Sequence, residues 1–167
     1  MLSHEQLIQQ YNLLPHPEGG WYKQTYKSVE HISAAALPER FGGDRPFSTA
    51  IYFLLEKGNY SAFHRIKSDE CWHFYRGDPL EIIVLQPNGE LAVTTLGNDI
   101  TKGHLFQYVV PAGCWFASRP APGSQYCFVG CTVAPGFDFA DFEMANGEQL
   151  ASEFPQHNNL IRELCRQ

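Results

Sequence analysis

Short stretches in which apolar and polar residues alternate run along most of this chain, with turn signals between them. Such stretches at regular spacing predict the strands of an antiparallel all-β protein. Residues 47–55 are instead almost continuously apolar, which is typical of a strand deep in a core. The remaining strands that the pattern predicts are 21–26, 80–85, 91–96, 105–110, 114–118 and 125–134.

Helical periodicity is confined to the two ends of the chain. Ser3 and Gln6 fit a capping box for a helix over 3–13. Asn146 can cap a helix over 148–154, and the apolar face of a terminal helix follows at Leu160, Ile161 and Leu164. We therefore predict one all-β domain over 1–167, an antiparallel double-stranded jelly roll like a β-barrel, with short N- and C-terminal helices. Its core spans about 18–145, and a helical extension covers 146–167. The stretch 28–46, rich in glycine and proline, is the expected mobile loop.

The central stretch, from Gly58 to Gly77, contains most of the candidate chemistry. A glycine turn, a strand, a polar turn at 67–69 and a second strand fit its spacing. Side chains alternate along a strand, so four residues are expected on one inner wall: His64, Ile66, Glu70 and Trp72. Further along the chain, Cys114, Phe116 and Ser118 share one face and are expected to line the same cavity.

Other candidates depend on less regular geometry. His73 has the parity of the opposite face, where it would suit a subunit contact, unless a bulge turns it inward. Tyr52 and Glu18 are candidates for the mouth of the cavity. At such a position Trp72 is more often a core residue than a ligand contact, and the alternative for Glu70 is an ion pair with Arg65 or Arg76. The acids Asp138, Asp141 and Glu143 are expected to form a solvated edge after the last strand.

The central stretch resembles the first motif of the cupin superfamily. Gly58, His64, Glu70 and Gly77 stand at its spacing, while Ile66 replaces its second histidine. The second cupin motif resembles the run Pro111-Ala-Gly113-Cys-Trp-Phe116, with Phe116 in place of its histidine and Gly103 displaced upstream. Three further phrases resemble a branch of small cupins called domain of unknown function 985, over about 6–145. They are Pro17-Glu-Gly-Gly-Trp-Tyr22, Ser68-Asp-Glu-Cys-Trp-His73 and Gly130-Cys-Thr-Val-Ala-Pro-Gly136.

The cupin resemblance also bears on metal binding. Cupin metal sites use three histidines and a glutamate, and only His64 and Glu70 remain here. Isoleucine and phenylalanine cannot ligate a metal, and two protein ligands rarely hold a divalent ion tightly. We therefore expect no metal and no cofactor, and a cavity with an apolar floor.

Composition narrows the class of partner. The 167 residues are 44% hydrophobic and 14% aromatic, which indicates a packed globule, and the net charge is −6. No basic patch favours nucleic acid, and no apolar run is long enough to span a membrane. The polar N-terminus and five unpatterned cysteines indicate reduced thiols in the cytoplasm. We expect a homodimer that binds a small molecule, with the aromatic strand at 21–26 as an edge that a second chain can cover.

Two functions fit these residues. By resemblance to the dTDP-sugar epimerases, which work without metal through a histidine backed by a carboxylate, His64 would abstract a proton next to a carbonyl. Glu70 would then hold His64, and Tyr52 or Tyr108 would be the opposing acid. The alternative is a non-catalytic cupin module that binds a small ligand, in which His64 and Glu70 only line the pocket.

Overall fold

The computed structural model describes residues 2–166, and its strands form two main sheets and a short arm. The larger sheet has the order β1-β2-β5-β12-β7-β10, the smaller has the order β13-β6-β11-β8-β9, and the arm is β3-β4. The strands are β1 Leu14–Pro15, β2 Trp21–Lys27, β3 His31–Ile32, β4 Arg45–Pro46, β5 Thr49–Glu56, β6 Ser61–Arg65, β7 Asp69–Gly77, β8 Leu80–Leu85, β9 Leu91–Leu96, β10 Gln107–Val110, β11 Trp115–Pro120, β12 Tyr126–Ala134 and β13 Glu143–Met144. The α-helices are α1 His4–Tyr11, α2 Gly147–Glu153 and α3 Asn158–Glu163. Single 3-10 turns occur at Ala34–Ala36, Ile100–Lys102, Phe139–Asp141 (η3) and Pro155–His157.

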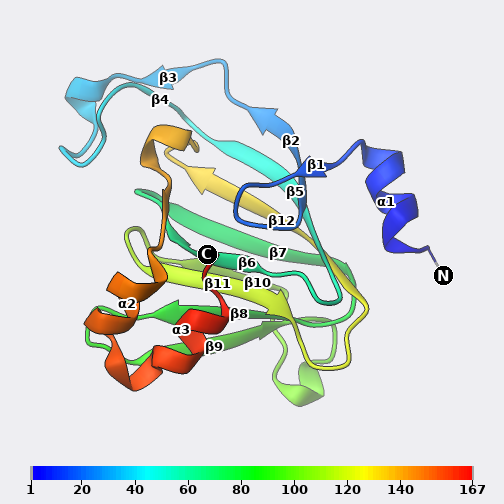
Figure 1. Ribbon diagram of the computed structural model, residues 1–167. Coiled ribbons are helices and arrows are strands. Elements are labelled where there is room, and N and C mark those ends of the chain that lie inside the picture. The colour runs from blue at the N-terminus through cyan, green and yellow to red at the C-terminus, as the bar shows by residue number, and fades with distance from the viewer. Residues whose placement is uncertain (1, 167) are drawn as a thin grey trace.

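The two sheets pack face to face around the main hydrophobic core (Figure 1). Phe53 and Trp72 reach this core from the larger sheet, and Ile82, Val84 and Phe116 reach it from the smaller one. All of these side chains are almost completely buried, because alternate residues of each strand face the space between the sheets.

The helices cover the outer faces of the sheets. Leu150 of α2 and Ile161 of α3 pack on Ile83 and Ala117 of the smaller sheet. Leu7 of α1 packs on the outer side of β5 and β12. No helix within residues 2–166 is both long and apolar enough to cross a membrane.

The prediction of a mostly β protein with antiparallel sheets and terminal helices is confirmed. The Ser3–Gln6 capping box and the Asn146 cap are both present. Hydrogen bonding between the described strands leaves the two sheets separate and does not close them into a barrel, so the jelly roll stays a prediction.

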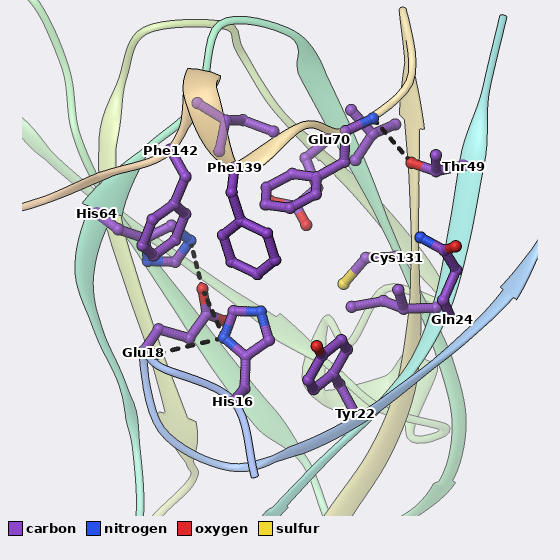
Figure 2. A pocket seen from close by; sticks show the side chains of 14 residues that line it. His16, Glu18, Tyr22, Gln24, Thr49, His64, Glu70, Cys131, Phe139 and Phe142 are labelled. Atoms are coloured by element: carbon purple, nitrogen blue, oxygen red, sulfur yellow. Dashed lines mark hydrogen bonds and ion pairs between the residues drawn. The ribbon is translucent and has the colours of Figure 1, made fainter. Parts of the chain in front are cut away.

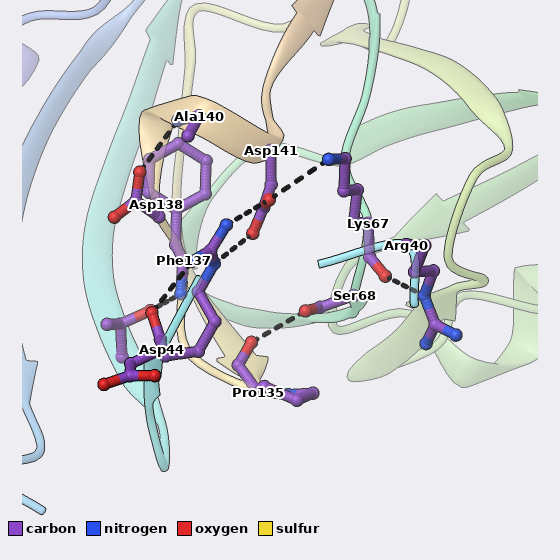
Figure 3. Close-up of polar contacts among 11 residues, drawn as sticks. Arg40, Asp44, Lys67, Ser68, Pro135, Phe137, Asp138, Ala140 and Asp141 are labelled. Atoms are coloured by element: carbon purple, nitrogen blue, oxygen red, sulfur yellow. Dashed lines mark hydrogen bonds and ion pairs between the residues drawn. The ribbon is translucent and has the colours of Figure 1, made fainter. Parts of the chain in front are cut away.

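The arm fastens the segment that follows β12. Arg45 of β4 donates two hydrogen bonds of 2.6 Å to the carboxylate of Asp141, and both side chains are buried (Figure 3). Thr49 accepts a 2.9 Å hydrogen bond from the backbone N–H of Phe137, and Ser68 donates one of 2.8 Å to the carbonyl of Pro135. The expectation of a solvated acidic edge is therefore wrong for Asp141, because a cation from the arm draws it inward. We call residues 137–142 the aromatic roof, since Phe137, Phe139 and Phe142 lie in it.

Candidate functional site

A cavity of about 230 Å³ lies beneath the aromatic roof. Both main sheets, the turn between β1 and β2, and the roof contribute to its walls (Figure 2). The residues that line it are His16, Glu18, Tyr22, Gln24, Thr49, Ile51, His64, Ile66, Glu70, Cys131, Val133, Phe137, Phe139 and Phe142. Mostly apolar walls with a few convergent polar groups are the usual composition of a small-molecule site.

His64 lies in β6 with both ring nitrogens in contact with other groups. Its Nδ1 donates a 2.7 Å hydrogen bond to the carbonyl of Ala62, so Nε2 faces Oε2 of Glu18 at 3.0 Å. Burial lowers the pKa of His64, against the opposing charge of Glu70, and burial raises the pKa of Glu18. Both directions favour one proton shared between the Glu18 carboxyl and His64 Nε2, so that the pair carries no net charge.

His16 sits beside Glu18 at the same end of the cavity. The backbone N–H of Glu18 donates to Nδ1 of His16 at 3.3 Å, which places the His16 proton on Nε2. Figure 2 shows this second nitrogen directed toward the middle of the cavity. Burial lowers the pKa of His16, so the ring is neutral and presents an N–H donor to the cavity.

Glu70 lies at the start of β7 in the larger sheet, whereas His64 lies in the smaller sheet. Glu70 is only 9% exposed. It forms no ion pair with any residue in the described range, and the carboxylate that contacts His64 is that of Glu18. Burial raises the pKa of Glu70 to about 7, assisted by the charge of Glu18 and opposed by His64 and the nearby Cys131 and Trp72. A carboxyl group with such a pKa can both accept and donate a proton at neutral pH.

The residues predicted from the central motif divide into two groups. His64, Ile66 and Glu70 line the cavity together with Glu18. Phe116 lies directly behind His64, with ring centroids 4.2 Å apart, and belongs to the buried core. Ser118 is also fully buried on β11 and is not part of the cavity wall.

Three predicted ligand contacts lie elsewhere. Trp72 is 1% exposed and packs between the sheets, so it is a core residue rather than a ligand contact. Tyr52 packs with Tyr11 and Phe128 on the outer side of the larger sheet, because its parity on β5 is opposite to that of Ile51. His73 is on the same outer side, where its Nε2 contacts Thr132 Oγ1 at 2.7 Å and Gln107 donates to its Nδ1.

Several cavity residues were not predicted. Tyr22 and Gln24 alternate along β2 toward the cavity, and this strand was expected only as a subunit edge. His16 comes from the turn that precedes it. No strand pattern predicts the three phenylalanines of the aromatic roof, because they follow the last long strand. Their close spacing in the sequence was the available signal.

The cavity does not provide the metal ligands found in many cupins. Ile66 presents a hydrocarbon wall, and the Phe116 ring occupies the space against His64. Across residues 2–166, no group of three or more histidine, cysteine, aspartate or glutamate side chains is placed to hold a metal ion. The residues present therefore do not fit such a metal site.

Two antiparallel sheets packed face to face, with the glycine, histidine and glutamate spacing of the first cupin motif at an internal cavity, define a protein of the cupin class. Residues 5–145 match the family described as cupin superfamily, DUF985, and the chain belongs to this family.

Relatives of similar size support this assignment. An X-ray structure of a Shewanella oneidensis protein is 37% identical, with a TM-score of 0.89, and the match covers 99% of each chain. A hypothetical protein from Leishmania major is 33% identical, with a TM-score of 0.90, over 99% of this chain and 100% of its own. An uncharacterised Saccharomyces cerevisiae protein is 29% identical over 155 residues, which are 87% of this chain and 77% of the yeast protein.

Oxalate decarboxylase of Bacillus subtilis shares only the fold. One of its structures is 13% identical with a TM-score of 0.55, and the match covers 94% of this chain and 38% of that enzyme.

Proposed function

We propose that the protein is a metal-independent isomerase or epimerase of a small sugar-like carbonyl compound. The observation that carries this proposal is Glu70, a buried carboxyl group without an ion-pair partner among the described residues, which faces the cavity with a pKa of about 7. Groups with a pKa near the working pH are the best suited to move protons in both directions.

The arrangement of His64 favours Glu70 as the base. Ala62 and Glu18 occupy the two nitrogens of the His64 ring, so neither nitrogen is free to reach a substrate carbon. We therefore propose that His64 positions Glu18, and that Glu70 takes the proton. This exchanges the roles that the sequence suggested for His64 and Glu70.

The proposed reaction needs three groups of the cavity. The Glu70 carboxylate removes the proton from the carbon next to the carbonyl, and the C–H electron pair forms the double bond of an enolate. The enolate oxygen accepts a hydrogen bond from Nε2–H of His16. In an isomerase, the deprotonated carbon carries a hydroxyl group: its O–H proton passes to the enolate oxygen, Glu70 returns its proton to the former carbonyl carbon, and the new carbonyl forms at the first carbon. In an epimerase, the Tyr22 hydroxyl gives a proton to the opposite face of the same carbon. The Tyr22 oxygen then takes a proton from solvent, and Glu70 releases its proton to solvent.

Exchange of substrate hydrogen with solvent tests this proposal. A panel of keto-sugars is incubated with the protein in deuterium oxide, and the incorporated deuterium is measured by NMR. We expect Glu70→Gln to reduce exchange at least hundredfold, and Tyr22→Phe to reduce epimerisation while Tyr52→Phe, on the outer face, has no effect. Exchange that is unchanged in Glu70→Gln would remove Glu70 as the base. Binding of a keto-sugar without any exchange would favour the alternative, a binding module.

A further inference from the structure

The walls of the cavity contain acidic groups without matching basic side chains. Of the fourteen lining residues, two are glutamates and none is lysine or arginine. Among the described residues, the ionic partners of these carboxyl groups are two histidines: Glu18 Oε2 lies 3.0 Å from His64 Nε2 and 3.6 Å from His16 Nδ1. Because His16 is neutral and His64 shares one proton with Glu18, the cavity as a whole carries either no charge or the negative charge of Glu70.

Aromatic rings form another part of the cavity wall. Phe137 and Phe139 meet edge to face with centroids 4.9 Å apart, and Phe139 meets Phe142 at 5.9 Å. Tyr22 packs against His16 at the far side. Figure 2 shows Phe139 and Tyr22 on either side of the open space, with Glu70 behind it. The faces of such rings attract cations, most strongly where water is excluded.

We propose that this cavity binds a small organic cation, an amine or a quaternary ammonium group, and rejects anions. The positive group would lie between the aromatic roof and the Glu70 carboxylate, where both surfaces attract it. A dianion of the oxalate type would instead meet Glu70 without any lysine or arginine to balance it. The inference deepens the proposed function and rests on it for catalysis: the substrate would be a carbonyl compound that also carries an amino group.

The groups around Glu70 also predict how binding depends on pH. Glu18, His64, Cys131 and Trp72 face its carboxyl group, and burial together with Glu18 keeps it partly protonated near neutrality. A bound cation favours the ionised form, so binding releases a proton and strengthens as the pH rises through 7.

Three ligands of the same shape and different charge test the inference. Choline is the cation, 3,3-dimethyl-1-butanol its uncharged isostere, and 3,3-dimethylbutanoate the anionic one, and binding is measured by calorimetry. At pH 8 we expect choline to bind at least tenfold more tightly than the alcohol, with no binding of the anion. Lowering the pH to 6 should weaken the binding of choline about tenfold, because Glu70 becomes protonated. The affinity for the alcohol should not change.

Two variants make the test specific to the cavity. Glu70→Gln should remove the preference for choline, whereas Glu143→Gln, an exposed carboxylate outside the cavity, should retain it. The inference is overturned if the alcohol or the anion binds as tightly as choline, or if none of the three binds. If the protein prefers choline but exchanges hydrogen in no carbonyl compound, only the proposed catalysis is overturned. If it exchanges hydrogen in uncharged keto-sugars but does not prefer choline, only the inference of cation binding is overturned.

Discussion

At the scale of single residues, Glu70 is held in the folded protein at a cost to stability. Its pKa rises from 4.5 to about 7 on folding, so between these values the folded protein keeps a proton that the unfolded chain releases. The free energy of unfolding therefore falls as pH rises through this window, by about 3 kcal/mol in total. Below pH 4.5 both states are protonated, and the penalty is absent.

Glu70→Gln should remove this penalty. We expect the variant to be more stable than the wild type at pH 8, by about 2–3 kcal/mol, and nearly equal to it at pH 4.5. Urea unfolding at both pH values measures the difference. A variant that is less stable than the wild type at pH 8 would show that the Glu70 carboxylate is stabilised in the fold, contrary to the arrangement described here.

The sequence predicts cavity residues only where a local motif places them on a strand. Alternation along β6 and β7 correctly brings His64, Ile66 and Glu70 to one cavity. It fails for the partner of His64, because Glu18 arrives from a turn far away in the sequence. It also fails for Trp72, since alternation gives the side of the sheet and not the depth in the core.

At the scale of elements, the arm and the aromatic roof depend on one buried ion pair. Arg45 and Asp141 are 5% and 4% exposed, and Lys67 adds a longer contact of 3.7 Å to Asp141. Removing one partner of a buried pair leaves the other charge without compensation, which commonly costs about 3–5 kcal/mol.

Asp141→Asn should therefore destabilise the protein by about 3 kcal/mol and loosen the aromatic roof. Urea unfolding gives the stability, and limited proteolysis gives the accessibility of residues 135–142. The matched control is Glu143→Gln, which breaks the exposed pair with Arg65 and should cost less than about 1 kcal/mol. Equal effects of the two substitutions would contradict a fastening role for Arg45 and Asp141.

Elements with a clear period were predicted well, and those shaped by distant contacts were not. Strands β8 and β9 have the predicted bounds, because each is a regular run between strong turns. The stretch 28–46 contains the paired strands β3 and β4. Its buried Arg45 pairs with Asp141, almost a hundred residues later in the sequence, and no local pattern predicts such a contact.

At the scale of the whole molecule, the two sheets form an apolar interior with one acidic cavity at its edge. The antiparallel class follows from the sequence, since turn signals separate short strands throughout. The assembly does not follow in the same way: the homodimer through the β2 edge stays a prediction. The proposed function depends on a single property of the folded protein, the protonation of Glu70 in the cavity.

Carbon-13 NMR of the glutamate side-chain carboxyls measures that property most directly. With the Glu70 signal assigned by Glu70→Gln, its titration should have a midpoint at about pH 7. The midpoint should move downward in Glu18→Gln, because a neighbouring carboxyl that raises the pKa is removed. A Glu70 midpoint near the ordinary value of 4.5 would contradict both the proposed catalytic base and the pH dependence of cation binding.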